Sequence, residues 1–316
     1  MFTPLALIAG LLILILGAES LVRGASALAL KLGVTPLIIG LTIVAFGTSA
    51  PELAVSLKSA LAGNSGIALG NVIGSNIANI GLILGLTALV RPIGVQSMMV
   101  KRDIPLMLFA SLLFWGLISD GSLSQLDGAL LCSMLIVYLG MNYLFDKQQA
   151  DTESMELKPL APLLAVVLLL VGIAMLVGGG ILFVDGAVAL ARQLGMSELL
   201  IGLTIIAIGT SMPELITSLV AARRGESDIA IGNLVGSNLF NILGILGITA
   251  LIHPITASVP KLDMLVMVSL ALLLLPLAWS GLRVGRREGA LLLLCYLVYL
   301  GYLVLSAQSY ELAPPF

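Results

Sequence analysis

The chain has 316 residues, of which 59% are hydrophobic and only 10% are charged. A soluble domain carries about 25% charged residues, so the composition excludes a soluble globular protein and a disordered chain. The 15 basic and 17 acidic residues give a net charge of −2, which leaves no basic field to hold nucleic-acid phosphates. Cys132 and Cys295 both lie in apolar runs, so this is not a disulfide scaffold. The long apolar runs indicate a polytopic membrane protein.

Apolar stretches of about 20 residues, broken by Gly, Pro or charge, predict ten membrane spans. They lie at about 4–22, 36–61, 67–90, 103–119, 126–145, 160–184, 197–222, 229–252, 263–280 and 288–306. The runs are continuous and do not alternate, so we expect helices, which satisfy their own backbone groups in hydrocarbon. The first basic residue, Arg23, follows the first span. That span therefore lacks the basic start of a signal peptide and is expected to be retained.

Basic residues are distributed unevenly between the two sides of the membrane. Twelve of the 15 lie at the ends of spans 1, 3, 5, 7 and 9, and only Lys58, Arg192 and Lys261 lie on the other side. The positive-inside rule makes the first side cytoplasmic and both termini extracytoplasmic. We expect a multi-pass protein of the plasma (inner) membrane, with a first five-helix repeat at 1–145, a cytoplasmic linker at 146–159 and a second five-helix repeat at 160–316.

Two long motifs occur twice in the chain at one offset of 162 residues. GLTIVAFGTSAPEL at 40–53 matches GLTIIAIGTSMPEL at 202–215, and GNVIGSNIANI at 70–80 matches GNLVGSNLFNI at 232–242. Packing through small residues explains one Gly-rich motif, but not two long motifs at the same offset. Because each half has five spans, an odd number, the second half enters the membrane inverted. Many secondary transporters have inverted repeats and bind substrate between them near the bilayer midplane.

The first repeated motif predicts a break in the middle of spans 2 and 7. Pro51 has no N–H, so the carbonyl of Gly47 loses its helical partner, and Pro213 has the same effect on Gly209. Each break is followed by a glutamate. A carboxylate at the bilayer centre costs about 3 kcal/mol or more, and neither Glu52 nor Glu214 has a basic residue within a helical turn. A proton or a bound cation must compensate the negative charge of these two carboxylates.

Other polar residues share helix faces with these carboxylates and with each other. Residues at i, i+4 and i+8 lie on one face of a helix. Such stripes are formed by Asn71, Ser75 and Asn79 in span 3, by Asn233, Ser237 and Asn241 in span 8, by Thr48, Ser49, Glu52 and Ser56 in span 2, and by Thr210, Ser211, Glu214 and Ser218 in span 7. Their oxygens suit hard cations such as Ca²⁺, Na⁺ or Mg²⁺. For Asn76 and Asn238, off the main stripe, a ligand role and an interhelical hydrogen bond remain open.

Polar residues away from these stripes have simpler explanations. Glu19 and Arg23 form an i,i+4 pair near a span end and predict a surface ion pair. Asp103 and Asp263 are expected at the beginnings of spans 4 and 9, where helix N-termini favour acids. With one histidine and no HExxH motif, the chain lacks the nucleophile, base or metal motif of an intramembrane hydrolase, so we do not expect an enzyme.

At the two repeated motifs the sequence resembles the alpha repeats of the sodium/calcium exchangers, within the cation/calcium antiporter superfamily. The resemblance implies an all-α membrane protein of ten helices in two inverted five-helix repeats. It implies that Ca²⁺ and Na⁺ bind as transported ions, with no cofactor. The ligands it implies are Glu52, Glu214, Thr48, Ser49, Thr210, Ser211, Ser75, Ser237, Asn79 and Asn241.

The chain departs from parts of this superfamily in informative ways. The potassium-dependent branch has Asp at the position of Asn241, so potassium co-transport is not expected. The proton/calcium branch typically has an acid after a GN motif, where this chain has the runs at 72–74 and 234–236. The large cytoplasmic regulatory region of animal exchangers is absent from this sequence, so that form of calcium regulation is not expected.

These features lead to one main hypothesis and two alternatives. We expect a secondary antiporter that exchanges Ca²⁺ for Na⁺ by alternating access, with Glu52 and Glu214 at the centre of its site. Exchange of Ca²⁺ or another divalent cation for H⁺ is the first alternative, since buried glutamates also carry protons. A cation channel lined by the same oxygens is the second, and the inverted repeat favours the transporter over it. The oligomeric state is not readable from the sequence.

Overall fold

A computed structural model describes residues 3–146, 160–196, 207–257 and 260–311. Within these ranges, eight helices are long and apolar enough to cross a membrane, and one bent pair of helices makes a ninth. The predicted all-helical membrane protein is therefore confirmed. The predicted count of ten stays a prediction, because the span at 197–222 begins among residues outside the described ranges. The linker predicted at 146–159 also lies almost entirely outside them.

The first half of the chain forms α-helices interrupted by π-helical turns, which carry the label η. Its elements are α1 (Thr3–Leu32), α2 (Pro36–Ile39), η1 (Gly40–Val44), α3 (Ala45–Thr48), α4 (Ala50–Leu61), α5 (Ser65–Ala78), η2 (Asn79–Leu84), α6 (Gly85–Val90), β1 (Ile93–Gly94), η3 (Met99–Asp103), α7 (Ile104–Leu117), the 3₁₀ turn η4 (Ile118–Asp120), β2 (Ser122–Leu123) and α8 (Gln125–Asp146). The sequence predicts the spans but not the π-turns, which widen a helix locally and are frequent at functional sites.

The described part of the second half follows this order, except that no π-turn equivalent to η3 precedes α15 there. Its elements are α9 (Pro162–Gln193), α11 (Ala207–Thr210), α12 (Met212–Arg224), α13 (Ser227–Leu239), the π-turn η7 (Phe240–Leu246), α14 (Gly247–Ile252), β3 (Ile255–Thr256), α15 (Lys261–Trp279), the 3₁₀ turn η8 (Ser280–Leu282), β4 (Arg283–Val284) and α16 (Arg286–Glu311). The π-turn η7 begins 161 residues after η2, at the second copy of the same motif. Local structure thus follows the sequence repeat.

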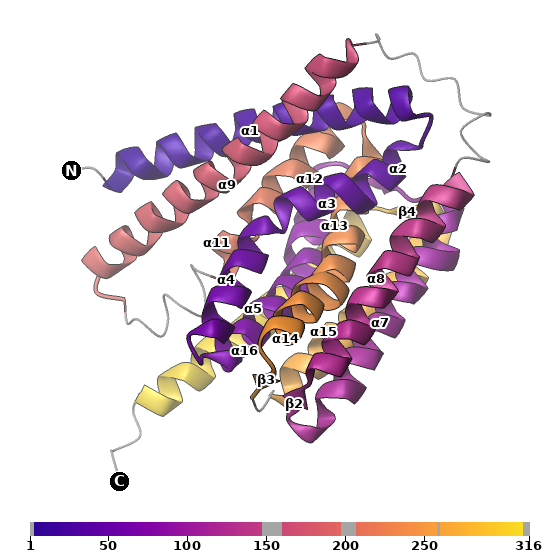
Figure 1. The fold of residues 1–316 in the computed structure, drawn as a ribbon. Coiled ribbons are helices and arrows are strands. Elements are labelled where there is room, and N and C mark those ends of the chain that lie inside the picture. Colours follow the sequence, from indigo (N-terminus) through magenta and orange to yellow (C-terminus); the bar gives the residue numbers. More distant parts are fainter. Residues whose placement is uncertain (1–2, 147–159, 197–206, 258–259, 312–316) are drawn as a thin grey trace.

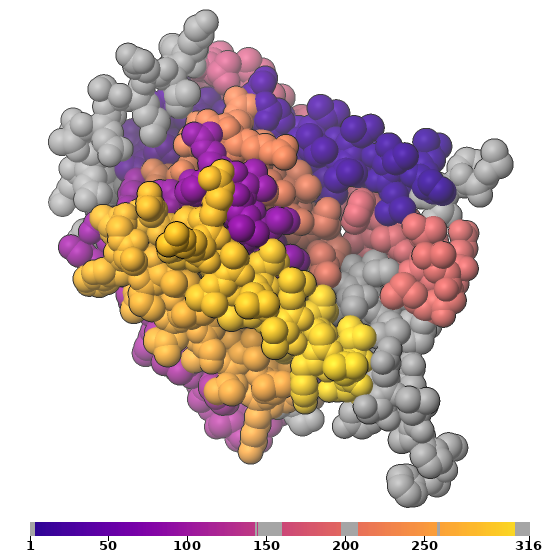
Figure 2. Space-filling view, turned by 180° about the vertical axis from the view of Figure 1, so that it is seen from behind, coloured from indigo at the N-terminus to yellow at the C-terminus, as the bar shows by residue number. Residues whose placement is uncertain are grey.

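The centre of the bundle is formed by the third span of each half. In the stretches Ser65–Val90 and Ser227–Ile252, 78% and 83% of an 18-residue apolar window is buried, against 17% for the window in Arg286–Ser306 of α16. A buried apolar cluster that includes Ile77, Ile83, Leu239 and Leu243 joins the two stretches. The outer helices pack around them, and the C-terminal helices, coloured orange to yellow, cover much of the rear face in Figure 2. These two inner stretches carry the repeated Asn and Ser motifs.

α1 and α9 form a long antiparallel pair along one flank of the bundle, at the top of Figure 1. Glycines make their close approach possible. A Cβ at Gly172 would lie 2.6 Å from the backbone N of Leu21, and a Cβ at Gly24 would lie 2.7 Å from the carbonyl O of Ala165. Both helices run further than their predicted spans of 4–22 and 160–184. At 30 and 32 residues, both are longer than the roughly 20 residues that cross a hydrocarbon core.

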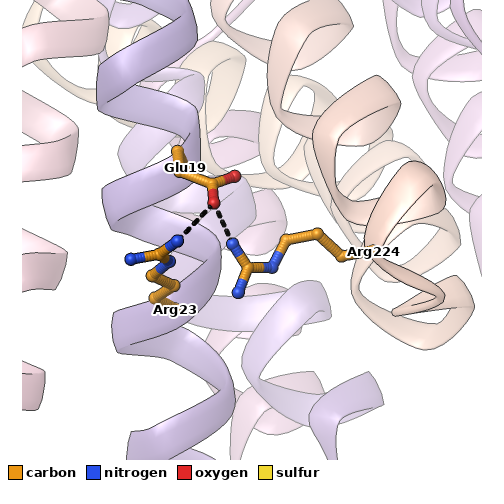
Figure 3. A network of polar contacts seen from close by, with 3 residues as sticks. All are labelled: Glu19, Arg23 and Arg224. Carbon is orange, nitrogen blue, oxygen red and sulfur yellow. Dashed lines mark hydrogen bonds and ion pairs between the residues drawn. The ribbon is translucent and has the colours of Figure 1, made fainter.

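A polar network ties α1 to the end of α12, at the surface (Figure 3). The Arg23 Nη2 atom donates to Glu19 Oε1 at 2.9 Å, which confirms the ion pair predicted from their spacing. Arg224 also donates to the same carboxylate oxygen. All three side chains are partly exposed, with between 33% and 55% of each accessible. The network therefore links the two halves of the chain at the edge of the bundle.

Asp103 lies deeper than its predicted place at the beginning of span 4. The π-turn η3 begins four residues earlier, at Met99, so Asp103 ends that turn and is fully buried. Arg102 Nε donates to it at 3.0 Å and the Tyr138 hydroxyl at 3.3 Å. Asp263 instead lies in the first turn of α15, as predicted, and accepts from the Tyr299 hydroxyl at 3.0 Å.

Candidate cation site

Span 2 breaks where its proline predicts. α3 ends at Thr48, Ser49 leaves the helical conformation with φ −82° and ψ 7°, and α4 begins at Ala50 with Pro51 in its first turn. The two parts of the span meet at a bend of 46°. The second half does the same, since Ser211 has φ −88° and ψ 10° between α11 and α12. The break thus begins a new helix at the middle of each span.

Glu52 and Glu214 occupy the first turns of these new helices. A helix N-terminus carries partial positive charge and free N–H groups, which stabilise a nearby carboxylate. Both residues are only 1% exposed. Among the described residues, no Lys or Arg forms an ion pair with either carboxylate. The negative charge at the centre of the molecule is therefore met by dipoles alone until a cation or proton arrives.

The two breaks are joined crosswise by their serines. Ser49 Oγ donates to Glu214 Oε1 at 3.0 Å, and Ser211 Oγ donates to Glu52 Oε1 at 3.2 Å. Ser211 Oγ also lies 3.3 Å from Ser75 Oγ in α5. Each carboxylate thus takes a hydroxyl bond from the opposite half of the chain. These crosswise hydrogen bonds bring the Thr-Ser-Glu motifs of both repeats together.

Asn71 and Asn233 connect each broken helix to the span that follows it. Asn71 Nδ2 donates to the carbonyl O of Glu52 at 3.1 Å and to Ser56 Oγ at 2.9 Å. Asn233 Nδ2 makes the equivalent bonds to the second half, to Glu214 O at 3.4 Å and Ser218 Oγ at 3.0 Å. These asparagines were predicted on the ligand stripes, but their amides hold the backbone of the glutamates.

Thr48 adds a contact across the halves, since its Oγ1 donates to Asn233 Oδ1 at 3.0 Å. Thr210 occupies the matching position in the second half and is also buried, with 9% exposed. The two predicted threonines therefore lie at the breaks beside their serines. Thr48 supports the framework of the site through Asn233.

Asn79 and Asn241 lie at the beginnings of the π-turns η2 and η7, in which Asn79 is the first residue and Asn241 the second. Both are 1% exposed. Asn79 Nδ2 donates to Asn238 Oδ1 at 2.9 Å, which again joins the two halves. A π-turn inserts an extra residue and shifts the side chains that follow it. Both amides therefore lie where an α-helix gives way to a π-helical turn.

Of the buried side-chain oxygen atoms that have no hydrogen-bond partner in the described structure, six belong to the two repeated motifs. They are Glu52 Oε2, Glu214 Oε2, Asn76 Oδ1, Asn79 Oδ1, Asn241 Oδ1 and Ser237 Oγ. An unpartnered buried polar atom costs about 1–3 kcal/mol, so six of them from two repeated motifs require a common explanation. Oxygen atoms of carboxylate, amide and hydroxyl groups are the ligands of hard cations. Within the described residues, no cluster of three or more His, Cys, Asp and Glu side chains offers a transition-metal site.

Two small cavities adjoin the breaks. One, of about 50 Å³, is lined by Pro51, Thr210 and Pro213 together with residues of α9. The other, of about 60 Å³, is lined by Ser49, Phe46, Leu53 and Phe240 among others. Each is large enough for one or two water molecules, whose share of liquid volume is about 30 Å³.

The ten residues predicted as ligands lie at the two breaks and on the two inner spans that pack against them. Sequence reasoning missed Met107 of α7, whose sulfur lies 3.5 Å from Asn238 Nδ2. No pattern in the sequence distinguishes this methionine from the other apolar residues of its span. Only packing of α7 against α13 brings it to the site.

Comparison with known proteins agrees with this architecture. A family model described as sodium/calcium exchanger protein matches residues 2–144 and 164–305. The chain is 45% identical to the putative antiporter CaxA of Alkalimonas amylolytica, over 94% of this chain and 97% of that protein. It is 41% identical to the inner membrane protein YrbG of Escherichia coli, over 94% and 95% of the two chains. The sodium/calcium exchanger MaX1 of Methanosarcina acetivorans is 34% identical, over 94% and 97%.

A solved structure has the same fold. The sodium-calcium exchanger NCX_Mj, soaked with Na⁺ and Ca²⁺, superposes with a TM-score of 0.82 at 34% identity, over 95% of this chain and 98% of that one. Such coverage leaves no large region of either chain unmatched. With the family match over both halves, it follows that this chain is a multi-pass membrane antiporter of the sodium/calcium exchanger family and not an enzyme.

Proposed function

We propose that this protein exchanges Ca²⁺ for Na⁺ across the membrane at the site between Glu52 and Glu214. The observation that carries the proposal is the set of buried oxygens without partners on five of the proposed ligands, namely Glu52, Asn79, Glu214, Ser237 and Asn241. The ligands we propose are the two glutamates with Thr48, Ser49, Thr210, Ser211, Ser75, Ser237, Asn79 and Asn241. No cofactor is needed, since the bound ions are the cargo.

The charge of the site supports Ca²⁺ as one of the ions. Ca²⁺ takes 6–8 oxygen ligands in flexible geometry, and two carboxylates offset its charge. The same oxygens suit Na⁺, so several Na⁺ and one Ca²⁺ compete for one space. Competition for a single site, open to one side at a time, is sufficient for coupled exchange. The names of the relatives MaX1 and NCX_Mj support this pair of ions.

Many transporters with alternating access are built from two matched halves, and the strand pairs support such an arrangement here. β1 pairs with β4, and β2 pairs with β3, so each pair joins a loop of one half to a loop of the other. β3 begins 162 residues after β1, at the offset of the sequence repeat. We propose ten helices in two inverted five-helix repeats, at 1–145 and 160–316, joined by a cytoplasmic linker at 146–159.

The membrane and the ion coupling are part of the proposal. We place the protein in the inner membrane, as the name of the relative YrbG indicates for that protein, with both termini extracytoplasmic by the positive-inside rule. Asn241, where the potassium-dependent branch has Asp, supports exchange that does not need K⁺.

Uptake of radioactive Ca²⁺ into proteoliposomes tests the proposal. Vesicles loaded with Na⁺ are diluted into buffer free of Na⁺ and K⁺, beside vesicles that carry only a pH gradient. We expect uptake that depends on internal Na⁺ and is lost in a variant with both Glu52→Gln and Glu214→Gln. Equal uptake by that variant would contradict the proposal.

Two other outcomes identify the alternatives. Uptake driven only by the pH gradient would indicate proton/calcium exchange, for which two buried glutamates without basic partners are also suited. Ca²⁺ flux that needs no counter-ion would indicate a channel. If neither gradient drives uptake by folded protein, the same assay with Mg²⁺ or another divalent cation identifies the substrate.

A further inference from the structure

Asn76 and Asn238 occupy equivalent positions of the two repeats, but their side chains make different contacts. Both are buried, and the sequence leaves open whether each is a ligand or a hydrogen-bonding residue. Asn76 Nδ2 donates to the carbonyl O of Val72 in its own helix, and Asn76 Oδ1 has no partner. Both the nitrogen and the oxygen of the Asn238 amide form hydrogen bonds with other helices. The two residues therefore have different roles.

The donor end of Asn238 faces α7 and α5. Its Nδ2 lies 3.5 Å from Met107 Sδ and 3.5 Å from the carbonyl O of Asn76, and it donates to both. A thioether sulfur accepts hydrogen bonds but cannot donate them. Met107 is fully buried, so water cannot replace it as the partner. The sulfur thus favours the orientation of Asn238 in which nitrogen, and not oxygen, points at α7.

The acceptor end of Asn238 then faces Asn79. Asn238 Oδ1 accepts from Asn79 Nδ2 at 2.9 Å. The opposite orientation of Asn238 would place its NH₂ group against the NH₂ group of Asn79, donor against donor. Because an amide group is planar, holding Asn79 Nδ2 also fixes Asn79 Oδ1 on the other side. That oxygen is buried and has no partner in the described structure.

From this chain of contacts we propose that Met107 and Asn238 form a positioning pair, which aims the carbonyl oxygen of Asn79 at the transported cation. Asn238 itself does not bind the ion, since its oxygen is occupied by Asn79. The inference rests on the proposed function, in which Asn79 is a ligand. It adds a residue outside the repeated motifs, and it makes the two halves of the site unequal.

The chain offers a matched control in Met267. Met107 and Met267 both lie four residues after a buried or half-buried aspartate near the beginning of their span, Asp103 and Asp263 respectively. Both methionines are buried, with at most 1% exposed. Met267 accepts no hydrogen bond from any residue in the described part of the chain. A replacement there also changes the packing of a buried methionine, but it removes no hydrogen bond to an amide of the site.

The first experiment measures Ca²⁺ and Na⁺ affinity of the purified, full-length protein from the rise in Tm that each ion produces. We expect Asn238→Leu to raise the Kd for Ca²⁺ about tenfold, which corresponds to the loss of about 1.4 kcal/mol for one misaligned ligand. Asn79→Leu should raise it by a similar factor. The double variant should be no weaker than Asn79→Leu alone, because Asn238 acts through Asn79.

The second experiment changes only the sulfur and does not depend on how the Asn238 variant folds. Met107→Leu conserves volume and should raise the Kd for Ca²⁺ about threefold. Met107→Gln, which supplies an amide oxygen as acceptor, should restore it. Met267→Leu should leave it unchanged.

Particular results would overturn the inference. Additive effects of Asn79→Leu and Asn238→Leu would make Asn238 an independent ligand. Equal effects of Met107→Leu and Met267→Leu on the Kd for Ca²⁺ would show that Met107 contributes only by packing. A folded wild-type protein with no shift in Tm from either ion would instead contradict the proposed function itself, and with it the role of Asn79.

Discussion

The centre of the bundle buries polar side chains, whereas the α1–α9 pair on its flank buries glycines. At the centre, Glu52 and Glu214 lie among serine, threonine and asparagine residues that bond across the halves. On the flank, Gly172 and Gly24 let two helix backbones approach each other. Gly10 and Gly24 of α1 match Gly172 and Gly186 of α9 at the offset of 162 residues, so both regions belong to the same sequence repeat. The comparison shows that one repeat can supply a chemical site at its motifs and a packing surface at its first helix.

The largest expected effect is at the centre, where removal of one charge unbalances the site. Glu52→Gln halves the negative charge that faces Ca²⁺, so we expect Ca²⁺ affinity to fall at least a hundredfold, with little change in the Tm of the ion-free protein. The ion-dependent rise in Tm measures this directly. Glu19→Gln, at an exposed glutamate, is the matched control. If the Glu52→Gln protein bound Ca²⁺ with wild-type affinity, the Glu52 carboxylate would not be part of the site.

The next prediction concerns the flank, where we expect a change in the stability of the ion-free protein. In Gly172→Ala the new Cβ would lie 2.6 Å from the backbone N of Leu21, and backbone cannot move aside as a side chain can. We expect a loss of about 1–3 kcal/mol of stability from overpacking, seen as a lower Tm of the ion-free protein. Gly178→Ala is the control on the same helix, since this glycine is exposed and meets no described atom within 4 Å. Equal Tm values for the two variants would contradict close packing at Gly172.

A smaller effect is expected at the crosswise serines. The Ser211 hydroxyl donates a hydrogen bond to Glu52 Oε1. Its oxygen keeps lone pairs that can face a cation. Ser211→Ala should therefore weaken Ca²⁺ binding several-fold, by less than the loss of a carboxylate. The change is measured by Ca²⁺ titration beside Ser133→Ala, an exposed serine that bonds only within α8. Tighter binding in Ser211→Ala would show that the hydroxyl competes with the cation for Glu52.

The smallest effect is expected in the exposed network of Glu19, Arg23 and Arg224. Exposed ion pairs contribute about 0.2–1 kcal/mol and are screened by salt. Arg224→Gln should lower Tm slightly in low salt, and the difference should disappear at high salt. Ca²⁺ affinity should not change. A salt-independent loss of stability would indicate that Arg224 contributes by packing and not by charge.

The sequence alone predicts much of this architecture. Continuous apolar runs predict helical spans because the bilayer leaves no other partner for the backbone. Pro51 and Pro213 predict the helix breaks because proline removes a hydrogen-bond donor. The repeated motifs predict which residues are polar at the centre. The structure places the ten predicted ligands at the two breaks and along α5, η2, α13 and η7, but their binding of ions stays a proposal.

Other features were decided only by tertiary structure. The π-turns at Asn79 and Asn241 have no signature in the sequence, since their residues also suit an ordinary helix. Asn71 was predicted on a ligand stripe, yet its amide reaches the backbone of Glu52, because the distance between α4 and α5 decides which partner is nearest. Asn76 and Asn238 occupy the same position of the repeated motif but differ in contacts, because Met107 accepts a hydrogen bond only from Asn238.

The sequence by itself thus determined which residues carry oxygen atoms into the membrane and where the helices break. These are local properties of residue type and spacing along one helix. Tertiary structure decided which oxygens are used by neighbouring donors and which remain without a partner. That distinction depends on distances between helices far apart in the chain. A difference of a fraction of an ångström decides whether a donor and an acceptor form a hydrogen bond.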